Sequence, residues 1–194
     1  QIPADVPWLS DASLPVSAQG ELQIQVTQQP VDGREGVLVY HPNTLHVGVG
    51  CERGTSSNEL IELVRSTLTK HGLAQGAVAG VFSLDVKSDE VAVHALASEL
   101  GVPARFFDAS TLENEALRLA NPSDVVFAEV GCHGVSEGAA LAAAGPAAEL
   151  IVPKHKSKRA TCAVAVIEAP SETALGGTPR GELKVVGIGP GARE

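Results

Sequence analysis

The stretch from Leu45 to Glu59, LHVGVGCERGTSSNE, most constrains what this chain can fold into. Leu45, Val47 and Val49 are the apolar positions of an alternating run, which predicts a β-strand that ends near Gly50. The glycines within the run let the backbone turn, or approach a ligand, where a β-carbon would clash. We therefore expect a strand that hands over to a helix through a glycine loop.

The helix after this loop is predicted by its start signal. Ser56 and Glu59 have the spacing of a capping box, and apolar residues then recur at helical intervals, so the helix should begin at about Ser57. Unpaired N–H groups and the positive end of the helix dipole would make the loop an anion site, to which Arg53 adds a full charge. No Lys precedes the Thr-Ser pair of the loop, so it is not a P-loop, and nucleotide binding is disfavoured. A structural glycine turn and a ligand loop both remain open on these residues.

Composition, charge and cysteine content limit the classes of protein to which this chain could belong. The chain has 194 residues, 44% of them hydrophobic, and a formal net charge of −9, which suits one domain plus extra material and argues against a nucleic-acid partner. No apolar run approaches the roughly 18 residues of a membrane-spanning helix, and the start shows no signal peptide, so we expect a cytoplasmic protein with no membrane partner. The three cysteines have no CxxC spacing, which indicates neither a disulfide scaffold nor a zinc module. The chain lacks Met and begins with Gln1, which suggests a piece of a longer polypeptide.

The rest of the chain alternates between strand and helix patterns. In chain order we expect an extended arm at 1–20, a half-buried strand at 22–26, strands at 37–40 and 45–50, a helix at 57–72, a strand at 77–84, a helix at 90–100, a strand at 104–107, a helix from Ser110 or Thr111 to 119, a strand at 125–130, a helix at 136–144, and strands at 150–152 and 162–167. This rhythm predicts an α/β three-layer sandwich with a mainly parallel sheet, helices on both faces, and an antiparallel last pair.

Three loops should meet where ligands bind in such sheets, outside the carboxyl ends of the strands. These loops are 50–56, 83–90 and 129–137. In the second, Asp85, Lys87 and Glu90 could bind a substrate carboxylate and act in general acid/base steps, although such charged loops are usually solvated connections.

Two further motifs carry candidate chemistry. Cys132 and His133 are adjacent in a strand-like segment, so their side chains should point apart, which disfavours a shared metal ion. Flanking glycines instead suggest a second amide-rich loop.

The run Lys154 to Arg159, KHKSKR, is strongly basic in an acidic chain. It is either a solvated hairpin tip or an electrostatic guide for a polyanionic small molecule.

Five motifs resemble, in order and rough spacing, the C-terminal domain of the cobalamin-biosynthesis family CbiG and the related small CobE proteins: GVGCERGTSSNEL, SLDVKSDE, LGVPARFF, EVGCHGVSEGAALAAAG and LIVPKHKSKRATCAVAV. The resemblance spans about residues 45–167. It implies the activity of cobalt-precorrin 5A hydrolase, which opens a δ-lactone on the contracted macrocycle and releases acetaldehyde. A non-catalytic CobE-like corrinoid-binding or carrier module is the alternative. The implied partners are a polycarboxylate tetrapyrrole and other corrin-pathway enzymes, and a homodimer is left open.

The flanks of this domain resemble other parts of the pathway. Residues 1–44 look like an arm and a remnant of the CbiG central region, ahead of the domain at 45–168. Residues 169–194 look like a linker followed by the start of a precorrin methyltransferase, GELKVVGIGPG. S-adenosylmethionine would serve only that missing domain, and no cofactor is expected for the domain at 45–168.

The predicted site combines residues of the three loops and of the basic run. The predicted catalytic residues are Asp85, Lys87 and Glu90. The predicted substrate-binding residues are Gly50, Cys51, Arg53, Gly54, Thr55, Ser56, Glu129, Gly131, Cys132, His133, Ser136, Glu137, Lys154 and Lys156. No metal site is predicted.

Overall fold

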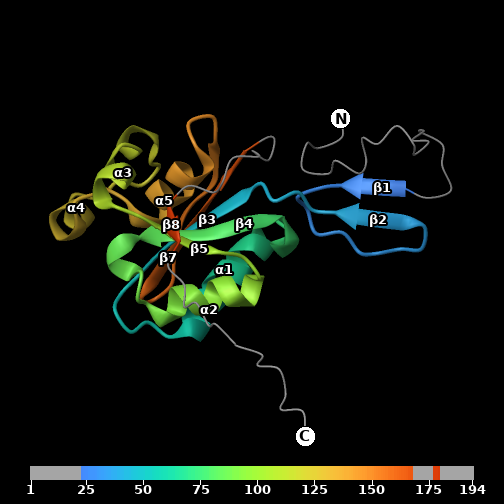
Figure 1. The fold of residues 1–194 in the computed structure, drawn as a ribbon, viewed down its shortest axis with the longest axis horizontal. Helices are drawn as coiled ribbons and strands as arrows, with labels where there is room; N and C mark the ends of the chain where they lie inside the picture. Colours follow the sequence, from blue (N-terminus) through green and yellow to red (C-terminus); the bar gives the residue numbers. More distant parts are fainter. Residues whose placement is uncertain (1–22, 168–176, 180–194) are drawn as a thin grey trace, which may run out of the picture.

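A six-stranded sheet with the order β6-β7-β3-β4-β5-β8 forms the centre of the computed structural model, which describes residues 23–167 and 177–179 (Figure 1). Its strands are β3 (Leu45–Cys51), β4 (Val78–Leu84), β5 (Ala104–Phe107), β6 (Glu149–Lys156), β7 (Ala160–Val166) and β8 (Thr178–Pro179). The helices are α1 (Ser57–Lys70), α2 (Val91–Leu100), α3 (Ala109–Glu113), α4 (Asp124–Val130) and α5 (Val135–Ala144).

The sheet is mixed. β3, β4 and β5 pair in parallel, as expected for strands joined by helices. β7 runs antiparallel to β3, β6 antiparallel to β7, and β8 antiparallel to β5. The α/β class and the antiparallel β6–β7 pair are therefore confirmed. Part of the predicted linker, at β8, joins the edge of the sheet.

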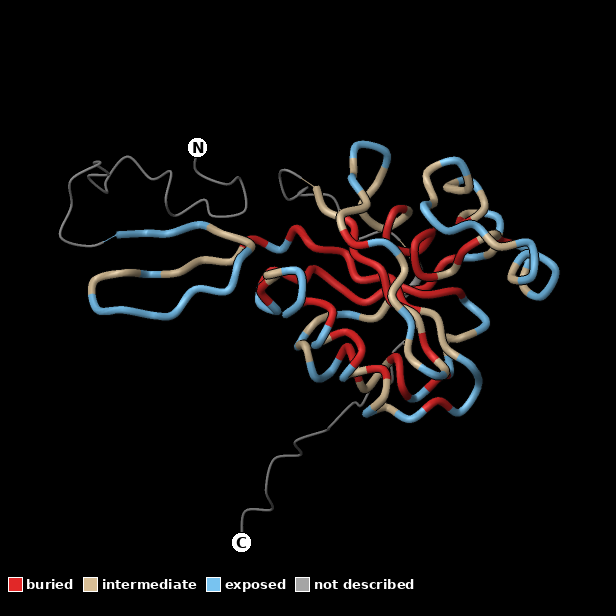
Figure 2. The backbone as a smooth tube through the Cα atoms, turned by 180° about the vertical axis from the view of Figure 1, so that it is seen from behind, coloured by how far each residue is buried: buried red, intermediate tan, exposed pale blue. Residues whose placement is uncertain are grey.

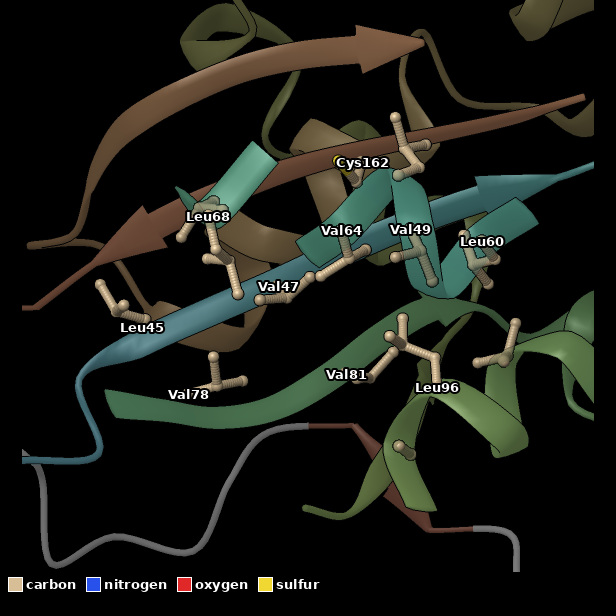
Figure 3. Packing of buried hydrophobic residues seen from close by; sticks show 14 of the residues in the cluster. Leu45, Val47, Val49, Leu60, Val64, Leu68, Val78, Val81, Leu96 and Cys162 are labelled. Carbon is tan, nitrogen blue, oxygen red and sulfur yellow. The ribbon is translucent and has the colours of Figure 1, made fainter. Parts of the chain in front are cut away.

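β3 is the buried central strand, and its two faces meet different helices. Val47 and Val49 belong to the same buried cluster as Leu60 and Val64 of α1, and Figure 3 shows these side chains pointing toward one another. Leu96 of α2 joins the same cluster. Alternate residues of a strand point to opposite faces, so this cluster accounts for one face of the sheet.

The opposite face is covered by α5, which comes close to the backbone of β3. A β-carbon on Gly48 would lie 1.9 Å from the carbonyl oxygen of Ser136 and 2.6 Å from the backbone nitrogen of Ala140, both in α5. A second buried cluster on this side joins Phe82 of β4 to Leu112 of α3. Gly48 therefore allows α5 to pack directly against the backbone of β3. This contact fixes the position at which α5 begins.

The strands β1 (Gln23–Val26) and β2 (Val37–Tyr40) form a separate two-stranded parallel ribbon that extends away from the main sheet. Figure 2 shows it as a projecting arm with little buried chain. The predicted strand is present as β1, but its predicted burial is wrong, because every residue of β1 is exposed, including Ile24 at 43% and Val26 at 40%. No second layer of the described chain covers the ribbon.

The predicted strand at 125–130 is wrong: this segment is helix α4. The Ser123 side chain accepts a hydrogen bond from the Val126 amide at the start, and Gly131 ends the helix with a left-handed φ of 80°. A short continuous apolar run cannot by itself distinguish a buried strand from a helix. The capping and terminating residues decided the outcome.

Two helix starts also differ from the sequence prediction. Ser56 is the N-cap residue of α1, but its side chain makes no capping bond, and Glu59 instead accepts bonds from the β6–β7 turn. The helix predicted from Ser110 or Thr111 to 119 is shorter, because Asp108 caps α3 through the Thr111 amide. A separate 3₁₀ turn follows at Ala116–Arg118.

Several predictions fall outside the described residues. These are the arm at 1–20 and the methyltransferase-like start at 181–191. Among the helices that the structure describes, none has the length and apolar character needed to cross a membrane.

The close approach at Gly48 generates a stability prediction. Gly48→Ala should lower the free energy of unfolding by about 2 kcal/mol or more, because the added methyl group collides with backbone rather than with a mobile side-chain tip. Gly33→Ala is the matched control, since its added β-carbon meets nothing within 4 Å. Urea denaturation of both variants measures the effect. Equal loss of stability in the two would contradict the packing described here.

Candidate functional site

A cleft of about 400 Å³ opens at the carboxyl ends of β3 and β4. All three predicted loops contribute to it, through Gly50 and Cys51, through Lys87, and through Glu129 and Ser136. The β6–β7 turn closes another side with Lys154 and its neighbours. Its volume is in the range usual for small-molecule sites. The predicted convergence of the loops on one cleft is therefore confirmed.

The cleft combines a charged side with an apolar side. We call its five cationic residues the basic wall: Lys87, Lys154, Lys156, Lys158 and Arg159. Two carboxylates, Glu52 and Glu129, also line the cleft. Leu84, Val126 and Val130 are among its apolar lining residues. A chain with a net charge of −9 thus collects positive charge in its cleft, which favours an anionic ligand.

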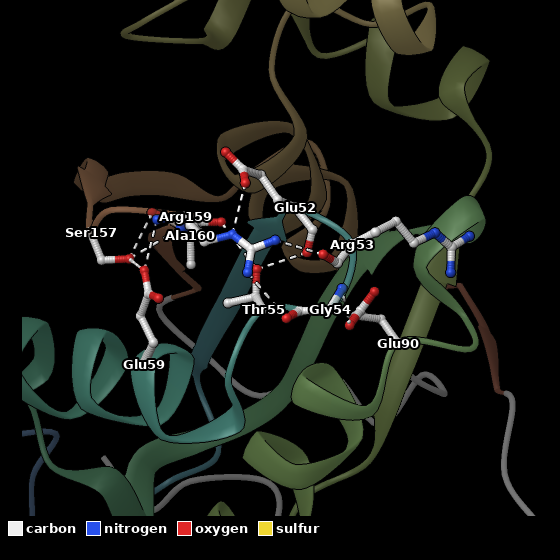
Figure 4. Close-up of polar contacts among 9 residues, drawn as sticks. All are labelled: Glu52, Arg53, Gly54, Thr55, Glu59, Glu90, Ser157, Arg159 and Ala160. Carbon is white, nitrogen blue, oxygen red and sulfur yellow. Dashed lines mark hydrogen bonds and ion pairs between the residues drawn. The ribbon is translucent and has the colours of Figure 1, made fainter.

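Arg159 ties the β6–β7 turn to the glycine loop. Its Nε donates to Oε2 of Glu52 at 2.8 Å, and its Nη2 donates to the Arg53 carbonyl oxygen at 2.7 Å (Figure 4). A third bond, from Nη1, reaches the Gly54 carbonyl oxygen at 3.2 Å. The planar guanidinium can make these bonds together, which a lysine could not. Arg159 is therefore occupied within the protein, and the lysines supply the remaining cations of the basic wall.

Glu59 holds the same turn from the side of α1. Its Oε1 accepts from the Ser157 hydroxyl at 2.6 Å and from the Arg159 amide at 2.7 Å (Figure 4). These two bonds hold the pKa of Glu59 below its ordinary value. The carboxylate that the sequence placed in a capping box thus positions the basic turn.

Hydrogen bonds also join the glycine loop at 50–56 to the charged loop at 83–90. Arg53 donates to Asp89 Oδ1 at 2.5 Å and to the Val86 carbonyl oxygen at 2.7 Å, and it does not line the cleft. Glu90 is buried and accepts from the Gly54 amide at 3.1 Å. Of the three predicted catalytic residues, Lys87 lines the cleft, whereas Asp85 and Glu90 do not.

The buried side chain of Glu137 links α5 to Asn121 and to strand β6. It is 1% exposed, and its carboxylate accepts from the amide and side chain of Asn121 and from the Lys154 amide, all within 2.9 Å. Burial opposes its ionisation, but these hydrogen bonds outweigh that effect and lower its pKa. Glu137 does not line the cleft, so its contacts give it a structural role.

The Cys132-His133 pair also lies outside the cleft lining. The ring of His133 stacks on Phe127, and its Nδ1 lies 2.8 Å from Glu113 Oε1. Burial raises the pKa of the Cys132 thiol, so this thiol stays protonated and is a poor nucleophile at neutral pH. Within residues 23–167 and 177–179, no three histidine, cysteine, aspartate or glutamate side chains gather to hold a metal ion.

Some of the remaining predicted residues line the cleft, and the others lie outside its lining. Gly50, Cys51, Glu129, Ser136, Lys154 and Lys156 line the cleft, whereas Gly54, Thr55, Ser56 and Gly131 do not. Burial and the nearby charge of Glu90 raise the pKa of the Cys51 thiol. The Thr55 hydroxyl donates to the Glu52 carbonyl oxygen at 2.7 Å, which shapes the loop.

Sequence reasoning missed several cleft residues. Lys158 and Arg159 belong to the basic run that it identified, and their neighbours in the turn could have suggested them. Val126 and Ser123 were missed because α4 was predicted as a strand. Glu52 lies at the mouth of the glycine loop that the sequence indicates, but its bond to Arg159, 107 residues away, could not be predicted.

Glu59 provides a test of how the turn is held. Glu59→Ala should make the Arg159 amide exchange hydrogen about tenfold faster, while Glu59→Gln, which keeps an acceptor oxygen, should have a smaller effect. Glu62→Ala, at an exposed position of the same helix, is the control.

The same carboxylate gives a pH dependence with a definite sign. Because the folded-state pKa is depressed, its stabilising effect is complete above the ordinary value of 4.5 and is lost as the pH falls through the lower folded-state pKa. The gap in exchange rate between wild type and Glu59→Ala should therefore close in acid. A gap that does not change with pH would contradict the assignment.

Comparison with known proteins places the domain in a family. The family model described as the cobalamin synthesis G C-terminus matches residues 45–165. Protein CobE of Sinorhizobium sp is 53% identical over 121 residues, which are 62% of this chain and 79% of that protein. A cobalt-precorrin-5A hydrolase of Priestia megaterium is 31% identical over 172 residues, 86% of this chain but only 45% of that protein. The chain thus spans less than half of the hydrolase.

Solved structures agree with these matches. The crystal structure of CobE, a protein from the cobalamin (vitamin B12) biosynthetic pathway, aligns with a TM-score of 0.61 at 36% identity and covers 67% of this chain and 94% of that one. The cobalamin biosynthesis protein chiG from Agrobacterium tumefaciens str. C58 aligns with a TM-score of 0.51 at 28% identity, over 64% of this chain and 98% of that one. Because the family model covers more than half of the sequence, the chain belongs to the family of the cobalamin synthesis G C-terminus.

Proposed function

We propose that the cleft binds a tetrapyrrole intermediate of corrin ring synthesis through its peripheral carboxylates. The family assigns the chain to cobalamin biosynthesis. The observation that carries the proposal is the basic wall, which concentrates Lys87, Lys154, Lys156 and Lys158 around one cleft of an acidic protein. Charge-assisted hydrogen bonds from ammonium groups suit carboxylates.

The apolar side of the cleft supports the same ligand class. Leu84, Val126 and Val130 offer surface to the face of a macrocycle, while the basic wall lies within reach of side chains at its rim. A ligand that is apolar in its centre and anionic at its edge would satisfy both sides. Free phosphate or a small dicarboxylate would leave the apolar residues unused.

The proposed reaction context is that of the hydrolase relative, which is named for the substrate cobalt-precorrin 5A. Opening a lactone adds water across an ester bond: the acyl C–O bond breaks, and a carboxylate and a free hydroxyl group result. Release of acetaldehyde then requires cleavage of the C–C bond between the hydroxyl-bearing carbon and the macrocycle, with the bonding electrons left on the macrocycle and the hydroxyl proton passed to a base. Lys87 lines the cleft and could stabilise the negative charge that develops on oxygen during lactone opening. Asp85 and Glu90 do not line the cleft, so Lys87 is the leading candidate.

We also propose the wider organisation that the sequence suggested. α1 and α5 contact opposite faces of β3, which supports a three-layer sandwich. A domain at 45–168, between a remnant of the CbiG central region at 1–44 and a methyltransferase start at 169–194, would make the chain part of a fusion of two corrin-pathway enzymes. Arg53 as a ligand residue stays a prediction, because ligand binding would have to compete with Asp89.

An assay for acetaldehyde tests the proposed reaction. The full chain is incubated with cobalt-precorrin 5A, and both bound ligand and released acetaldehyde are measured. Product formation that is lost in Lys87→Gln supports a hydrolase role. Binding without product would mean a binding or carrier module, and the absence of both would overturn the proposal.

The basic wall generates a prediction on binding. The double variant Lys154→Gln and Lys156→Gln should bind a corrinoid with free carboxylates, such as cobyrinic acid, about tenfold more weakly at low salt, and the difference should shrink at high salt. Lys70→Gln, on α1 outside the cleft, is the matched control. Titration at two salt concentrations measures both effects. Equal affinities of wild type and the double variant would exclude these lysines from the site.

A further inference from the structure

Ser136 is an unusual residue of the cleft. It lines the cleft, yet it is only 2% exposed, and its Oγ has no hydrogen-bond partner among the described residues. A buried hydroxyl without a partner costs free energy, and such groups in native structures call for an explanation. A ligand that supplies the missing partner is one such explanation.

The position of Ser136 on α5 indicates what kind of ligand would fit. Ser136 lies in the first turn of this ten-residue helix, and Gly134, the N-cap residue, offers no side chain to bond the first N–H groups. First-turn N–H groups have no partner inside their helix, and the helix dipole places positive potential there. The hydroxyl and the amides together form a donor set suited to an anion.

The surrounding charges agree with an anionic ligand. Lys154 and Lys156 line the same cleft. The nearest carboxylate along the chain, Glu137, is fully engaged with Asn121 and the Lys154 amide. Glu137 itself does not line the cleft, and the two carboxylates that do are Glu52, which is paired with Arg159, and Glu129.

The start of α5 is also held rigidly. Gly48 allows the Ser136 carbonyl to rest against β3, where any β-carbon would collide with it. A β-carbon at Gly50, which lines the cleft beside Ser136, would lie 2.9 Å from Thr161 Oγ1 and 3.4 Å from Val135. A preorganised donor set loses little entropy when it binds.

We propose that Ser136 Oγ and the first-turn N–H groups of α5 form a carboxylate subsite in the cleft, which holds one acidic side chain of the ligand. This inference rests on the proposed function and deepens it. The lysines attract any polyanion and act as mobile point charges. Ser136 instead adds a contact at a fixed position, because its short side chain is held at the start of α5.

The first experiment compares binding with stability. Ser136→Ala should bind cobyrinic acid about tenfold or more weakly, while its melting temperature stays equal to or above that of wild type, because the change removes an unpartnered buried hydroxyl. The loss should persist at high salt, unlike the loss in the lysine variant, since a buried bond is little screened. Ser66→Ala on α1 is the matched control. A Ser136→Ala variant that is destabilised, or that binds as tightly as wild type, would overturn the subsite.

A second experiment separates this subsite from the proposed function. Sodium acetate is titrated into the full chain while the amide signals of residues 135–137 are followed by NMR. Saturable shifts in wild type that are lost in Ser136→Ala support the subsite, even if no corrinoid binds, in which case the proposed function alone fails. Absent shifts, or equal shifts in both proteins, reject the subsite and leave corrinoid binding by the lysines standing.

Discussion

The contact between α5 and β3 at Gly48 sets the geometry on which the cleft depends. At this point a helix backbone rests directly on a strand backbone, with no space for a β-carbon. On its other face the same strand packs Val47 and Val49 against α1. β3 therefore positions α1, which follows it in the chain, and α5, which packs on its backbone, and with them the glycine loop and Ser136. The site is built on rigid elements of the sheet rather than on free loops.

The concentration of positive charge distinguishes this cleft from the other grooves that packed helices and strands leave on a protein surface. The β6–β7 turn brings several like charges together, which is unfavourable in the absence of a ligand. Burial and the nearby Lys156 charge lower the pKa of Lys154, which is the expected response to such crowding. Glu52 and Glu59 offset part of the repulsion through Arg159 and the turn amides. A polycarboxylate ligand would relieve the rest.

The sequence predicted the fold well where patterns were local. The alternation from Leu45 and the helical spacing after Ser57 predicted β3 and α1, and both are present. The apolar run at 125–130 was ambiguous, because it fits either strand or helix, and the flanking cap residues Ser123 and Gly131 belong to helix α4. The burial of β1 depended on tertiary context. Its alternating pattern predicts a half-buried strand, but no second layer of the described chain covers it.

The site, like the fold, could be predicted from the sequence only where its features are local. The glycine loop, Lys87 and the basic run are visible in the sequence, because loop position and charge are local properties. The partners of Arg53, Glu59 and Glu137 are not, since each lies 16 or more residues away. Sequence could name the charged residues, but only the fold shows which are left free for a ligand and which hold the protein together.

The location of a bound corrinoid tests the central claim most directly. A crystal structure of the full chain with cobyrinic acid should show the macrocycle against Leu84, Val126 and Val130, with carboxylate oxygens within about 3 Å of Lys154 or Lys156 and of Ser136 Oγ. A corrinoid bound elsewhere, or bound in the cleft with its carboxylates turned away from these residues, would contradict the account.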